Sequence, residues 1–133
     1  MSALIHQSTD AIFLRRALLA DAAASAATVL LLAFGAQYLT DLLGLPMALM
    51  RYAGMSLLPF AAIVLLVGLR ANPPRIPVLA IIAYNALWAI DSIVLLASGY
   101  VNPTRLGAAF VIAQAATVGA FAALQWIGLT RRR

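Results

Sequence analysis

Four long apolar blocks follow one another along the chain, separated by short segments that contain arginine, proline, asparagine or aspartate. Each block is close to the ~20 residues that a helix needs to cross the hydrocarbon core of a bilayer. We therefore expect helical spans over about 16–38, 46–69, 78–98 and 104–129. The pattern predicts an all-α membrane protein, an antiparallel bundle of four transmembrane helices in a single domain over residues 1–133.

Local signals predict where several of these spans begin, bend or end. Ser8 or Thr9 is expected to cap the first helix, because both side chains accept hydrogen bonds from free backbone N–H groups. Pro46 is expected to open the second span, and Pro59 to kink it, because proline donates no backbone hydrogen bond. Gly99 is expected to end the third span in the left-handed conformation that glycine tolerates best.

The composition strengthens the membrane assignment and argues against several kinds of chemistry. The chain is 65% hydrophobic and only 10% charged, whereas a soluble domain carries roughly a quarter charged residues. It has no cysteine and a single histidine, so thiol chemistry and cysteine-ligated metal sites are excluded. No nucleophile stands with a base in a recognisable pattern. We expect no enzyme activity, no catalytic residue, no metal site and no cofactor.

Charge is concentrated at the ends of the apolar blocks. All nine basic residues are arginine, and the net charge is +5. Arginines at the ends of membrane spans contact lipid head groups and set the topology. We therefore expect membrane lipids rather than nucleic acid as partners. On one side lie Arg15, Arg16, Arg70, Arg75, Arg131, Arg132 and Arg133, and on the other only Arg51 and Arg105. Because cytoplasmic loops are the arginine-rich ones, both termini are predicted to be cytoplasmic.

The third block carries unusual polar residues within its apolar run. At about 100° per residue, an arc of roughly a third of the helix contains Tyr84, Asn85, Trp88, Asp91 and Ser92. An aspartate inside a bilayer costs a few kcal/mol near the centre and normally has a partner. We therefore expect Asp91 to face the bundle interior, in the outer half, and to bond to Arg51, Gln114 or both.

The first and fourth blocks carry polar residues at matching depths. Asp21 and Gln125 are expected at one level near the cytoplasmic interface, where water and arginine would reach Asp21. Asn85 is expected near Thr117 and Thr28, and Asp91 near Gln114, so the polar groups could form a track. The alternative is that these groups only hold helices together, since hydrogen bonds between helices contribute ~0.6 kcal/mol each.

Other residues are assigned to packing and to lipid contact. Ala115, Gly119 and Ala123 repeat every fourth residue, a spacing of small side chains that allows another helix to approach closely. Trp88 is expected mainly to pack against its neighbours. Arg131, Arg132 and Arg133 are expected at lipid head groups.

Two segments resemble a family of small bacterial membrane proteins. The runs LLGLPMALMRYAG and NALWAIDS are similar to those of four-helix inner-membrane proteins of about this length, a family without an assigned activity. The resemblance implies the four-helix fold and a bacterial inner membrane, and it brings no functional residues. Small multidrug resistance transporters also have four spans, but they carry a glutamate in the first span, and this chain has no glutamate.

Two functions fit this sequence. The first is a non-enzymatic accessory or scaffold subunit that packs against other membrane helices, as part of a homo-oligomer or a larger complex. The second is a small oligomeric transporter or channel that uses the polar cluster around Asp91. Both hypotheses depend on where the side chains of that cluster lie.

Overall fold

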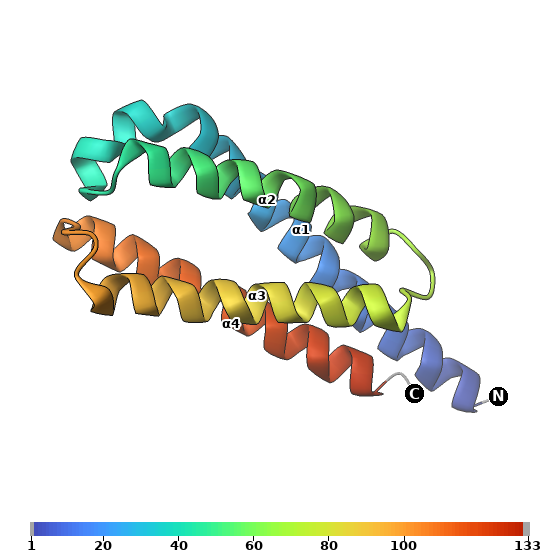
Figure 1. Ribbon diagram of the computed structural model, residues 1–133. Helices are drawn as coiled ribbons and strands as arrows, with labels where there is room; N and C mark the ends of the chain where they lie inside the picture. The colour runs from blue at the N-terminus through green and yellow to red at the C-terminus, as the bar shows by residue number, and fades with distance from the viewer. Residues whose placement is uncertain (1, 132–133) are drawn as a thin grey trace.

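The structure is a bundle of four α-helices that together account for nearly all of the chain. The computed structural model describes residues 2–131, and its side chains from residue 11 onwards. The helices are α1 (Ser2–Leu43), α2 (Met47–Gly68), α3 (Arg75–Ser98) and α4 (Arg105–Arg131) (Figure 1). All four are long and apolar enough to cross a membrane. The predicted all-α fold is confirmed, and the chain is a multi-pass helical membrane protein.

The observed helix ends differ most from the prediction in α1. This helix begins at Ser2 rather than after a cap at Ser8 or Thr9, and it continues to Leu43. Gly44 then takes a φ of +68°, the left-handed conformation that ends many helices. Gly99 has a φ of +80° after α3, as predicted. Both reversals therefore occur at glycines, which adopt this conformation without a steric penalty.

The chain reverses direction at each of its three connections (Figure 1). The pairs that pack most extensively are α1 with α2 and α3 with α4, and α1 also packs along α4. By contrast, α2 and α3 are consecutive in sequence but touch only over a short stretch. Helix α1 therefore packs against both α2 and α4, whereas α2 and α3 contact each other over only a small part of their lengths.

Hydrogen bonds fasten α1 to its neighbours at both ends of the bundle. At one end the backbone N–H of Thr104 donates to the carbonyl of Leu43 at 3.0 Å, and its hydroxyl donates to the carbonyl of Leu42 at 2.8 Å. At the other end the Nε of Arg15 donates to the carbonyl of Gly68 at 3.2 Å. Arginine satisfies a free carbonyl there and complements the negative end of the α2 dipole.

Glycines allow α1 to approach α2 and α4 closely. A methyl group added at Gly107 would overlap the carbonyl of Leu43, and one at Gly54 would lie 3.0 Å from the backbone nitrogen of Ala33. At Gly128 it would lie 3.1 Å from the Cα of Leu14. Small residues at such contacts let helices gain van der Waals packing, which matters in lipid because hydrophobic burial gives little advantage there.

The small-residue face predicted on α4 is only partly used within the chain. Ala115 is buried, but Ala123 is exposed. A methyl group at Gly119 would meet no atom within 4 Å. The close contact with α1 instead uses Gly107 and Gly128, which belong to a neighbouring face of α4. Packing of Gly119 and Ala123 against a helix outside this chain stays a prediction.

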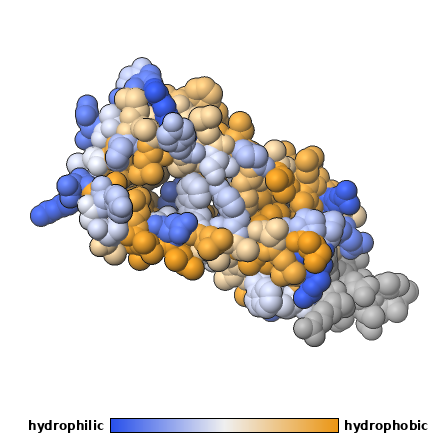
Figure 2. All heavy atoms as spheres, in the orientation of Figure 1, coloured by the Kyte–Doolittle hydropathy of each residue, from blue (hydrophilic) through white to orange (hydrophobic). Residues whose placement is uncertain are grey.

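The surface has the polarity expected of a membrane bundle. Hydrophobic residues cover much of the face shown in Figure 2, and hydrophilic residues gather towards its two ends. Many large apolar side chains are exposed, such as Phe34 at 71% and Leu66 at 65%. In a bilayer these side chains would face lipid tails, which requires no protein partner.

The close contact at Gly107 leads to a testable prediction. We expect Gly107→Ala to lower the free energy of unfolding by about 1–3 kcal/mol, because the added methyl group forces α4 away from Leu43. Gly119→Ala is the matched control on the same helix, because a methyl group at Gly119 meets open space. This substitution should be neutral or slightly stabilising. Unfolding in mixed micelles, followed by circular dichroism, measures both. Equal effects of the two substitutions would contradict the observed packing.

Candidate functional site

A buried polar network joins three of the four helices. Its centre is Asp21 on α1, which is 1% exposed. The Oδ2 atom of Asp21 accepts hydrogen bonds from Asn85 of α3 at 2.7 Å and from Gln125 of α4 at 2.8 Å. Its Oδ1 atom accepts one from the hydroxyl of Ser25 at 3.1 Å. Asn85 also donates to the side-chain carbonyl of Gln125 at 3.1 Å, which closes the network.

The positions along each helix bring these groups to one level. Asp21 lies six residues after Arg15, and Gln125 six residues before Arg131, each about 9 Å along its helix. Asn85 lies ten residues after Arg75, about 15 Å. Ser25 follows Asp21 by one helical turn and so shares its face. The network therefore lies well below the arginines at that end of the bundle.

The hydrogen-bond partners of Asp21 are all neutral side chains. All three neighbours of Asp21 donate to it, and an ionised carboxylate only accepts hydrogen bonds. These donors are amides and a hydroxyl, so none of them carries a positive charge. Arg15, one of two arginines about one and a half turns before Asp21, donates instead to the carbonyls of Gly68 and Leu69. The hydrogen-bond partners of Asp21 in the described chain are thus all uncharged.

The sequence predicted part of this network. Asp21 and Gln125 were expected at one level, and they are hydrogen-bonded. The expectation that water and arginine reach Asp21 is wrong, since its side chain is buried and Arg15 bonds elsewhere. The role of Asn85 was missed, because it was grouped with Thr117 and Thr28. In the sequence, the only signal for the role of Asn85 is that it lies on the same polar arc of the third span as Asp91.

Asp91 lies elsewhere than predicted. The prediction that it faces the interior and bonds to Arg51 or Gln114 is wrong, because Asp91 is exposed and no hydrogen bond to it is found in the part of the chain that the structure describes. Arg51 donates at 3.4 Å to Gln37 instead. Asp91 lies seven residues before the end of α3, about 10 Å along the helix.

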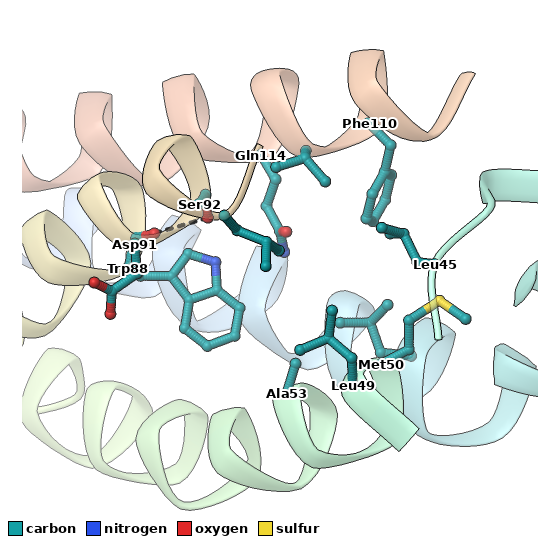
Figure 3. A pocket seen from close by; sticks show the side chains of 12 residues that line it. Leu45, Leu49, Met50, Ala53, Trp88, Asp91, Ser92, Phe110 and Gln114 are labelled. Atoms are coloured by element: carbon teal, nitrogen blue, oxygen red, sulfur yellow. Dashed lines mark hydrogen bonds between the residues drawn. The ribbon is translucent and has the colours of Figure 1, made fainter. Parts of the chain in front are cut away.

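A pocket of about 290 Å³ opens between α2 and α3 at the level of Asp91. Figure 2 shows the hollow on the face of the bundle, and Figure 3 shows its walls. Trp88 and Gln114 reach into it from α3 and α4, and Asp91 lies beside Trp88 at its edge (Figure 3). The remaining walls are mostly apolar and include Leu32, Leu45, Leu49, Met50, Ala53, Leu95, Phe110 and Val111, with Ser92 as a further polar residue.

An aromatic stack connects α2 and α3 next to this pocket. The rings of Phe60 and Tyr84 are 4.0 Å apart between centroids and nearly parallel, at 17°. The rings of Tyr84 and Trp88 are also stacked, with 6.0 Å between their centroids. The hydroxyl of Tyr84 and that of Ser56 are 3.2 Å apart, within hydrogen-bonding distance. Trp88 thus packs as predicted, and it also forms a wall of the pocket.

A second, smaller cavity of about 40 Å³ lies between Trp88 and Asp21. Trp88 and Gln114 line both this cavity and the larger pocket. Its other walls are Asp21, Ala24, Ser25, Thr28, Leu57, Thr117, Val118 and Phe121. The two spaces therefore share Trp88 and Gln114 as wall residues.

The remaining predicted residues do not join the hydrogen-bond network around Asp21. The hydroxyls of Ser92 and Thr117 donate to backbone carbonyls of their own helices, at 2.7 Å and 2.8 Å. The guanidinium of Arg131 lies 6.0 Å from the ring centroid of Phe13. Arg132 and Arg133 fall outside the residues that the structure describes. Within those residues, no three histidine or aspartate side chains gather as metal ligands would.

Comparisons of the chain with known protein families, curated proteins and solved structures find no match. The similarity to small bacterial four-helix membrane proteins therefore stays a prediction. What the site can do follows from its own geometry, which combines a buried carboxylate network with an open pocket edged by a second carboxylate.

The network leads to a prediction about stability. We expect Asn85→Leu to lower the free energy of unfolding by about 1–3 kcal/mol, because Asp21 and Gln125 each lose a partner in a buried site. Asp91→Asn on the same helix should leave stability unchanged or raise it, because the carboxylate of Asp91 is exposed and unpaired in the described chain. Unfolding in mixed micelles compares the two variants. A larger loss for Asp91→Asn would contradict the assignment of Asp21 as the structural centre.

Proposed function

We propose that the protein is a non-enzymatic membrane protein that binds a small amphipathic cation in the pocket between α2 and α3 and, as an oligomer, transports it. The arginine asymmetry supports an orientation with both termini in the cytoplasm, and the sequence resemblance supports a bacterial inner membrane. The single observation that carries the proposal is the exposed carboxylate of Asp91 at the edge of an apolar pocket.

The chemistry of the pocket matches a ligand with a positive charge and an apolar body. A carboxylate at membrane depth is costly unless a charge or donor compensates it, and the described chain supplies none to Asp91. Trp88 lies next to Asp91, and an indole ring attracts cations to its face. The leucine, methionine and phenylalanine walls would hold the apolar part of the ligand.

The size and position of the pocket support the same function. Its volume of about 290 Å³ is just below the ~300–1,000 Å³ typical of sites for small organic molecules. It lies between α2 and α3, which contact each other much less extensively than the other neighbouring helices do. An amphipathic molecule that partitions into the bilayer would reach it sideways from the lipid.

A second function, that of an accessory subunit, is supported by the outer face of α4. Gly119 has open space around it and Ala123 is exposed, so another helix could approach α4 closely there. Purification in a mild detergent followed by native mass spectrometry separates the two functions. A stable complex with other membrane proteins supports the accessory subunit, and a homo-oligomer supports transport.

Binding of benzyltrimethylammonium, an organic cation with an aromatic body, tests the first function. In a Trp126→Phe background only Trp88 remains as a fluorophore of this type, so its fluorescence reports on the pocket. We expect Asp91→Asn to weaken binding at least about tenfold, the equivalent of ~1.4 kcal/mol, because the substitution removes the charge and keeps the shape.

The neutral isostere neopentylbenzene is the matched control. The unchanged protein should bind this neutral compound more weakly than it binds the cation. The Asp91→Asn substitution should leave the affinity for the neutral compound unchanged. If the neutral compound binds as tightly as the cation, or if Asp91→Asn has no effect, the pocket does not select cations and the proposal is wrong.

A further inference from the structure

We propose that a lateral groove between α1 and α2 binds one anionic phospholipid, with an acyl chain along the groove and the phosphate at arginines beyond its end. The groove has a volume of about 470 Å³, and all of its lining residues are alanine, valine or leucine. It shares no residue with the pocket at Asp91, so the proposal does not rest on the function proposed above.

Short side chains create this lateral groove. Ala22 of α1 and Ala61 of α2 form its floor and are buried, at 6% and 8% exposure. Leu30 and Leu58 line its edges and are exposed, at 60% and 59%. Alanine leaves empty the space that a larger side chain would fill between two packed helices. The groove is therefore apolar throughout and open along its length to the surrounding lipid.

The length of the groove matches one leaflet of a bilayer. Leu19 and Leu30 line it eleven residues apart on α1, which is about 17 Å at ~1.5 Å per residue. One leaflet contributes half of the ~30 Å hydrocarbon core. A lipid tail along the groove gains van der Waals contacts on three sides, whereas a tail on a convex helix surface gains them on one.

Arginines lie just beyond one end of the groove. Arg15 precedes Leu19 by one helical turn and therefore lies on the same face of α1. Its guanidinium donates to the carbonyls of Gly68 at 3.2 Å and Leu69 at 3.5 Å. These bonds connect the two helices that form the groove and hold the guanidinium at its end. Arg16, the next residue, is exposed.

These arginines can bind a phosphate. A guanidinium has five N–H donors, and the two described bonds of Arg15 leave others unused. Arg70 follows α2 and is exposed, as Arg16 is. Of the three aspartates among residues 11–131, Asp21 is buried in its own network, and the other two lie in the opposite half of the bundle. No described carboxylate therefore neutralises this positive charge, and a phosphate complements it.

An anionic phospholipid is the partner that matches both features at once. A free phosphate ion would bind the arginines without using the groove, and an apolar helix would fill the groove without neutralising the arginines. A phospholipid joins a phosphate to an apolar chain, and its head group lies at the level of the arginines that flank a membrane span.

Lipid binding to the delipidated protein in an uncharged detergent tests the site, with native mass spectrometry to measure bound lipid. Dioleoylphosphatidylglycerol carries one negative charge, and dioleoylphosphatidylcholine has the same tails but no net charge. We expect the first to bind at least about tenfold more tightly, because only its phosphate is not balanced within the lipid. If the two lipids bind equally, the arginines select no head group and the proposal is wrong.

Arg16→Gln tests the head-group end of the site. Because Arg16 is exposed, the variant should fold, and we expect it to bind phosphatidylglycerol about fivefold more weakly while its affinity for phosphatidylcholine is unchanged. Arg105→Gln is the matched control, since it removes the same charge at the other end of the bundle. If both variants weaken binding equally, the lipid responds to net charge alone, which contradicts the proposal.

Ala26→Leu tests the groove itself. Ala26 lines the groove and is exposed, so a leucine occupies the space of the lipid tail. We expect both lipids to bind at least about fivefold more weakly, because the tail loses its contacts. Ala27→Leu is the control, at an exposed residue outside the groove, and should leave binding unchanged. If Ala26→Leu binds lipid normally, or if it only disrupts a dimer of the protein, the groove holds no lipid tail and the proposal is wrong.

Discussion

The carboxylate of Asp21 is the constraint on which the arrangement of the helices depends. Apolar side chains do not distinguish a neighbouring helix from lipid tails, so they set the relative rotation of membrane helices only weakly. A buried carboxylate strongly favours a neighbouring helix over lipid tails, because it needs hydrogen-bond donors that only the helix can supply. Asn85 and Gln125 supply those donors from α3 and α4. Their bonds fix the rotation and the height of both helices against α1.

The open side of the bundle follows from the same constraint. The network includes α1, α3 and α4 but no residue of α2. Helix α2 is held mainly along α1, through close packing at Gly54 and the bond from Arg15 to Gly68. Its contact with α3, through the stack of Phe60 on Tyr84 and the contact of Ser56 with Tyr84, is less extensive. The pocket beside that contact is therefore a consequence of which helices carry buried polar residues.

The membrane spans were predictable because length and hydropathy alone determine them, and the turn at Gly99 because its backbone conformation favours glycine. The site was harder. On the polar arc of α3, Asn85 and Asp91 lie at opposite edges, about 120° apart at ~100° per residue. The structure turns the Asn85 edge inwards and leaves the Asp91 edge exposed. Sequence periodicity defines the width of the arc, but only donors on the other helices decide which edge is buried.

Asp21 is thus buried and Asp91 exposed, and Trp88 and Gln114 line both the pocket at Asp91 and the cavity beside Asp21. A ligand in the pocket can shift the protein only between two arrangements that it distinguishes. The network around Asp21 resists rearrangement, since moving α3 or α4 would break buried hydrogen bonds. Helix α2 has no part in that network and forms the far wall of the larger pocket. Any second arrangement is therefore limited to changes that leave α1, α3 and α4 in register around Asp21.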